Sequence, residues 1–155
     1  MAIETRKIVT KITHAASEKK ALDIVTIDMR KLPTVCDYFV IASGTSTTHV
    51  RAIADSIIDK LKESGERPWH VEGEREALWM LIDYGDVVVH VFGQDTRKYY
   101  DLEKLWSDAP QKRYKEERKV KKVIRKPAGK KARKTKPALK KMAKSVKKLR
   151  KSRKK

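Results

Sequence analysis

Two segments of the chain repeat apolar residues at the spacing of an amphipathic helix. They are residues 7–20 and 45–64, with apolar faces of Ile8, Val9, Ile12, Ala15 and Ala16 in the first and Val50, Ile53, Ala54, Ile57, Ile58 and Leu61 in the second. Thr45 or Ser46 is placed to cap the start of the second helix. Gly65 suits the left-handed position just past its end, and Pro68 prevents its continuation.

Short stretches rich in β-branched residues lie between and after these helices and predict strands. Residues 21–29 form the first, and residues 37–43 are apolar almost throughout, which is typical of a strand covered on both faces. Residues 68–73 predict a third strand near an edge of the sheet, because Pro68 cannot donate a ladder hydrogen bond. A last helix is expected after Asp95 or Thr96, either of which would cap it, with an apolar stripe of Tyr99, Leu102, Leu105 and Trp106.

A β-hairpin is predicted where two apolar runs, residues 77–83 and 87–92, flank the turn Tyr84-Gly85-Asp86. It supplies the fourth and fifth strands. The order of elements is then αββαβββα. We therefore expect an α/β fold with a small mixed five-stranded sheet and helices.

The first strand of this hairpin presents two different faces, because side chains alternate along a strand. Leu78, Met80 and Ile82 share one face, and Trp79, Leu81 and Asp83 share the other. Only one face has to be core. Trp79 and Leu81 are then either apolar anchors for a protein partner or covered by the chain's own helices.

Charge divides the chain into two parts. Up to Asp108 there are 15 basic and 18 acidic side chains, whereas from Ala109 onward there are 24 basic and 2 acidic. Residues 109–155 also have few apolar residues, too few to offset the entropy of ordering the chain. The sequence therefore predicts a mildly acidic domain over residues 1–108 and a disordered or partly helical basic tail over residues 109–155.

Clustered lysines and arginines bind phosphate backbones by releasing counterions, with little sequence specificity. A merely solubilising role is the alternative. We expect the tail to contact RNA or DNA through Lys130, Lys131, Arg133, Lys134, Lys140, Lys141, Lys147, Lys148, Arg150, Lys151 and Arg153.

Several segments, in order, carry a family resemblance: D-Y-F-V-I-A-S-G-T-S from Asp37, V-E-G-E from Val71, D-Y-G-D-V-V-V-H-V from Asp83 and R-K-Y-Y-D-L-E-K-L-W from Arg97. They closely resemble the ribosomal silencing factor family, also called Iojap or RsfS, over roughly residues 3–106. The resemblance implies a nucleotidyltransferase-like topology without the catalytic carboxylates. It also implies binding to the large ribosomal subunit through ribosomal protein L-fourteen, which blocks joining of the small subunit and represses translation.

The resemblance and the strand faces together suggest which residues contact the partner. Trp79 and Leu81 would be the apolar anchors, with acidic neighbours Glu72 and Asp83 suited to a basic ribosomal protein. Tyr100 and Glu103 on the closing helix are further candidates. A monomer or homodimer in the cytoplasm is expected, with ribosomal RNA contacted by the tail. The alternative is a nucleic-acid-binding module that acts mainly through the tail.

No catalytic or metal-binding pattern accompanies these features, and we expect neither an enzyme nor a cofactor. The turn Ser43-Gly44-Thr45-Ser46 could hold a phosphate at a helix N-terminus, but capping is the role we expect. Asp23 and Asp28, five residues apart on one strand, are predicted to point to opposite faces and so cannot share a metal ion. His90, between valines, is expected to be a hydrogen-bonded sheet residue. The single cysteine, Cys36, is expected to be a buried thiol.

Overall fold

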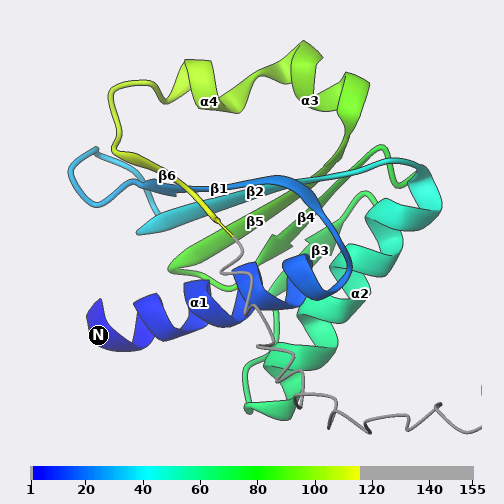
Figure 1. Ribbon diagram of the computed structural model, residues 1–155. Helices are drawn as coiled ribbons and strands as arrows, with labels where there is room; N and C mark the ends of the chain where they lie inside the picture. The colour runs from blue at the N-terminus through cyan, green and yellow to red at the C-terminus, as the bar shows by residue number, and fades with distance from the viewer. Residues whose placement is uncertain (1, 116–155) are drawn as a thin grey trace, which may run out of the picture. The chain divides into compact units, whose positions relative to one another are not determined.

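A mixed sheet lies between a layer of two long helices and a layer of two short ones (Figure 1). The structure is a computed structural model that describes residues 2–115, with side chains from Glu4 onward. Within this range the sheet has six strands in the order β3 (His70–Glu72), β4 (Trp79–Asp83), β5 (Val87–Gly93), β2 (Tyr38–Gly44), β1 (Leu22–Asp28) and β6 (Gln111–Arg113). β2 and β5 run parallel at its centre, and the other described pairs are antiparallel. The predicted α/β class and mixed sheet are confirmed.

The long helices α1 (Ala2–Glu18) and α2 (Thr47–Glu63) cover one face of the sheet. Their predicted apolar stripes are buried against β2, β4 and β5, with Ile12, Val50, Ile53, Ile57 and Leu61 all fully inaccessible. The predicted cap of α2 is confirmed, because the His49 amide donates to the hydroxyl of Ser46 over 3.1 Å. Gly65 ends the helix at a φ of +86°, as predicted, and its amide donates to the Lys62 carbonyl.

The short helices α3 (Gln94–Tyr100) and α4 (Leu102–Leu105) lie over the other face, where one continuous helix was predicted. The chain breaks at Asp101, whose backbone is left-handed at φ 43° and ψ 58°. The break divides the predicted stripe, so that Leu102 and Trp106 pack against the sheet while Tyr99 and Leu105 are 83% and 68% exposed. The predicted cap is also wrong: Gly93 holds the N-cap position of α3, without a side-chain hydrogen bond.

β6 is the strand that the sequence pattern did not indicate. Its three residues pair with Val25, Thr26 and Ile27 of β1. The chain before and after it is also bound to β1, because Pro110 accepts from the Asp28 amide and the Tyr114 amide donates to Ile24. Ala109 is buried, and Tyr114 packs against the core under α1. The sheet thus continues beyond residue 108, where the sequence alone placed the end of the domain.

The basic residues predicted to contact RNA, from Lys130 to Arg153, lie outside the described residues. Within residues 2–115, no helix is both long and apolar enough to cross a membrane.

Candidate docking surface

The β4–β5 hairpin places its side chains on two faces, as the alternation predicts. Met80 and Ile82 are buried in the core under α1 and α2, whereas Trp79, Leu81 and Asp83 are half-buried on the opposite face. Leu78 does not share the core face with Met80 and is 50% exposed. The reason is local: Ala77, just before it, has a φ of 52°, so the regular alternation begins only at Trp79.

Trp79 is partly covered by the chain's own aromatic side chains. Its ring stacks on Phe92 with centroids 4.8 Å apart and contacts Tyr100 of α3 at 4.7 Å. Its indole nitrogen Nε1 donates to Nδ1 of His90 over 3.2 Å. These contacts fix the orientation of the indole, and Trp79 remains partly exposed.

Cross-strand pairing brings further residues to the same face. Leu81 stands opposite Glu72 on β3 and His90 on β5, and Asp83 stands opposite Val88. Register partners on neighbouring strands share a face of the sheet. We define the docking surface as the partly or fully exposed residues of this sheet face together with Tyr100, which contacts Trp79; its members are Glu72, Trp79, Leu81, Asp83, Val88 and Tyr100. Apolar side chains lie at its centre, and two carboxylates lie beside them.

Of the six predicted partner-binding residues, five belong to this surface and Glu103 does not. The Glu103 carboxylate forms an ion pair with Arg97, whose Nε donates to it over 2.9 Å. Arg97 also donates to the Ser43 hydroxyl over 2.7 Å. Glu103 therefore ties α4 to the sheet, and its charge is neutralised within the fold.

His90 is the member of the site that sequence reasoning understated. It was predicted as a hydrogen-bonded sheet residue, which its Nδ1 contact with Trp79 confirms, but its link to the anchor was not foreseen. The side chain is 5% exposed, and desolvation by burial lowers the pKa of His90 to about 4. Counting the hairpin register outward from the turn would have placed His90 and Val88 opposite Leu81 and Asp83.

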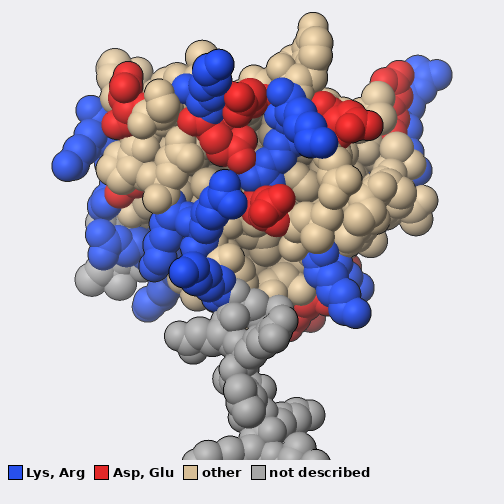
Figure 2. All heavy atoms as spheres, turned by 45° about the horizontal axis from the view of Figure 1, so that its top comes forward, with Lys and Arg blue, Asp and Glu red and all other residues tan. Residues whose placement is uncertain are grey.

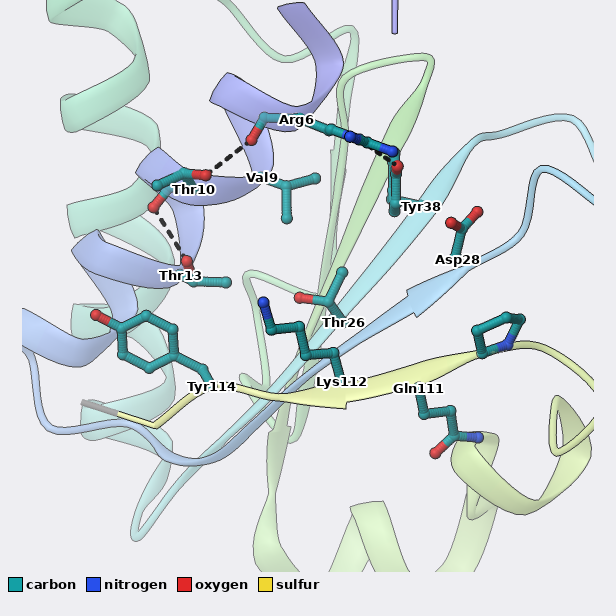
Figure 3. Close-up of a pocket in the computed structure, with 11 residues that line it drawn as sticks. Arg6, Val9, Thr10, Thr13, Thr26, Asp28, Tyr38, Gln111, Lys112 and Tyr114 are labelled. Carbon is teal, nitrogen blue, oxygen red and sulfur yellow. Dashed lines mark hydrogen bonds between the residues drawn. The ribbon is translucent and has the colours of Figure 1, made fainter. Parts of the chain in front are cut away.

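The two carboxylates of β1 do not meet in one site. Asp23 and Asp28 line different pockets, as their predicted opposite faces require. Asp23 lies on the α3–α4 side, whereas Asp28 lines the pocket on the α1 side, together with Arg6, Thr26 and Tyr38 (Figure 3). No cluster able to hold a metal ion occurs among residues 2–115. Cys36 is buried as expected, and desolvation raises the pKa of its thiol to about 11, so it is a poor nucleophile.

The glycine turn before α2 is used for helix capping. The Thr45 amide donates to Nδ1 of His49 over 3.0 Å, and the opposite nitrogen of that imidazole bonds the Lys19 carbonyl. Gly44 has no room for a side chain, since an added Cβ would lie 2.8 Å from the Val50 nitrogen. The turn therefore joins β2 closely to α2, in agreement with the structural role expected from the sequence.

The candidate docking surface is thus a partly exposed sheet face, with apolar and acidic side chains, on a small α/β protein. Residues 2–146 match the profile of the family described as ribosomal silencing factor during starvation. The chain belongs to this family, whose members act in ribosome-associated regulation of translation.

Similar proteins of known sequence and structure agree with this assignment. Ribosomal silencing factor RsfS of Bacillus subtilis is 50% identical over 106 residues, which are 68% of this chain and 90% of that protein. A crystal structure from Bacillus halodurans has a TM-score of 0.62 at 39% identity and covers 69% of this chain and 97% of that chain. Another from Chromobacterium violaceum has a TM-score of 0.64 at 38% identity and covers 66% of this chain and 85% of that chain. More distant is a mouse protein named mitochondrial assembly of ribosomal large subunit protein 1, 37% identical over 93 residues, which cover 58% of this chain and 41% of that protein.

Proposed function

We propose that this protein binds the large ribosomal subunit through ribosomal protein L-fourteen, blocks joining of the small subunit, and so represses translation. The observation that carries the proposal is the docking surface, where Trp79 and Leu81 of β4 and Val88 of β5 are partly exposed on the same face of the hairpin. Membership of the silencing factor family supports the ribosome as the target.

The composition of the surface suits a basic protein partner. Half-buried apolar side chains on a rigid sheet lose little conformational entropy on binding, and buried anchors of this kind dominate interface energies. Glu72 stands opposite Leu81 and Asp83 opposite Val88, and both carboxylates would favour a positively charged partner. The mechanism is steric, because occupying the joining surface is enough to exclude the small subunit.

Replacing Leu81 by glutamate tests this surface. We expect Leu81→Glu to weaken binding to purified large subunits at least about 30-fold, or about 2 kcal/mol, because a carboxylate would have to be desolvated at the centre of the interface. The thermal melt should change little, since Leu81 is only half-buried. Leu81 is a cleaner probe than Trp79, because Trp79→Ala would also remove the contacts with Phe92 and Tyr100.

Leu105→Glu is the matched control, because Leu105 is an exposed leucine on α4 outside the docking surface. It should bind large subunits, bind isolated L-fourteen and inhibit subunit joining like the unchanged protein. Equal losses in the two variants, or normal inhibition by Leu81→Glu, would show that the partner binds elsewhere.

The basic tail is proposed to add contacts with ribosomal RNA around the protein target. A protein ending at Lys115 keeps every described strand, so it separates the docking surface from the tail. The full chain should lose affinity for large subunits steeply as salt rises, with a slope of about 0.9 per phosphate contact on duplex. The shortened chain should show a shallow slope and converge with the full chain at high salt.

The same measurement addresses the second candidate function, a nucleic-acid-binding module acting through the tail. That alternative is favoured by the 24 basic residues from Ala109 onward. It predicts that the chain ending at Lys115 no longer binds large subunits or L-fourteen at all. Equal salt slopes for the two forms would instead show that the tail does not touch RNA in the complex.

A further inference from the structure

The two central strands create a crevice at their carboxyl ends. β2 and β5 run parallel and adjacent, with Gly44 and Gly93 paired at their ends. From there the chain enters α2 on one side of the sheet and α3 on the other, as Figure 1 shows. In open α/β sheets, such a divergence of successive connections leaves a crevice that commonly binds ligands.

A cleft of about 380 Å³ lies at this end of the sheet, on the α3–α4 side. Its floor contains Ser43, Arg97 and Glu103. The guanidinium of Arg97 donates both to Glu103 and to the Ser43 hydroxyl, so the charges at the floor are already neutralised by each other. The ligand preference of the cleft therefore depends on its rim.

The rim consists of two carboxylates, those of Asp23 and Asp101, and two cationic side chains, those of Lys98 and Arg113. They come from β1, α3, the α3–α4 break and β6. Among the described residues, none of these four side chains takes part in an ion pair or a side-chain hydrogen bond. Figure 2, with the α3–α4 layer turned forward, shows acidic and basic side chains interleaved over this face. Charges of both signs thus surround one small cleft without neutralising one another.

We propose that this cleft binds a small zwitterion of the free α-amino acid class. The ligand's carboxylate would contact Lys98 and Arg113, and its ammonium group would contact Asp23 and Asp101. A purely anionic ligand such as phosphate would be repelled by the two rim carboxylates, and a simple cation by the two basic groups. The volume is near the lower end of the range of small-molecule sites, about 300–1,000 Å³, which suits a compact ligand.

This site is separate from the docking surface, and its existence does not depend on the proposed function. The two are nonetheless close along the chain, because Lys98 and Asp101 flank Tyr100, whose ring contacts Trp79. A ligand that joins Lys98 and Asp101 to β1 and β6 would restrain the segment at the edge of the docking surface.

Titration of the isotope-labelled full chain with each of the twenty standard amino acids, followed by NMR, tests the proposal. We expect saturable amide shifts around Asp23, Gln94–Asp101 and Arg113 for one or a few of them. For each amino acid that binds, two analogues serve as control ligands. The N-acetylated form lacks the ammonium group, and the corresponding amine lacks the carboxylate. Both should bind at least about tenfold more weakly, because each loses one of two charge-assisted contacts.

Two rim variants and a control complete the test. Asp23→Asn and Arg113→Gln should each weaken binding about tenfold, whereas Asp95→Asn, on α3 but outside the cleft, should not. All three sites are exposed, so thermal melts should confirm that folding is retained. The proposal is overturned if no amino acid binds, if the shifts map elsewhere, or if inorganic phosphate competes with equal affinity.

Discussion

Ending the chain after Asp108 will lower its free energy of unfolding by about 4 kcal/mol, whereas ending it after Lys115 will leave stability nearly unchanged. The first truncation removes β6 and the hydrogen bonds that join residues 110–114 to β1. Each such bond contributes about 1 kcal/mol net, and the buried surface of Ala109 and Tyr114 adds a similar amount. The second truncation removes a segment with few apolar residues.

Urea denaturation of the full chain and of both truncated chains measures this difference. The midpoint should fall sharply for the protein ending at Asp108, and not for the one ending at Lys115. The shorter protein should also aggregate more readily, because loss of β6 leaves β1 as an unpaired edge. Identical midpoints for the two truncations would mean that β6 contributes nothing to the fold.

Acidification from pH 7 to pH 4 will remove about 3 kcal/mol of stability through His90. The pKa of His90 is about 4 in the folded protein and about 6.5 when unfolded, so the unfolded chain binds the extra proton first. The contribution of neutral His90 to the free energy of unfolding is therefore fully present above pH 6.5 and is lost as the pH falls toward 4. The rings in contact with His90, those of Phe39, Trp79 and Phe92, carry no charge, so no ion pair with them offsets the cost of a buried imidazolium.

The pH dependence of His90→Gln separates this effect from other titrating groups. Glutamine is neutral throughout the range and can still accept the Trp79 indole hydrogen bond. The quantity compared is the slope of unfolding free energy against pH between pH 6.5 and 4.5, which should be flatter for His90→Gln than for the unchanged protein. Asp28 does not titrate in this window. The side chain of Arg30 forms an ion pair with its carboxylate and lowers the pKa of Asp28 below its usual value. Parallel stability curves for the two proteins would show that His90 is not the group responsible.

The sequence by itself determined the features that depend on local spacing. The spacing of apolar residues on one helical face predicts helices α1 and α2. Ser46 and Gly65 predict where α2 begins and ends. The continuous apolar sequence of β2 indicated a central strand, and Pro68 indicated that β3 lies at an edge of the sheet. Much of the docking surface was also predictable, because alternation alone separates Trp79 and Leu81 from Met80.

Only the tertiary structure decided the features that depend on residues distant in the sequence. β6 consists of Gln111, Lys112 and Arg113, which carry no apolar signal, and it is a strand because the edge of β1 offers unpaired backbone groups. Glu103 is committed to Arg97 rather than to a partner because α4 folds back over the end of β2. Trp79 is only partly exposed because Phe92 on β5 and Tyr100 on α3, distant in the sequence, pack against its ring. Periodicity reports which face of an element is apolar, but which neighbour reaches that face is set by long-range packing.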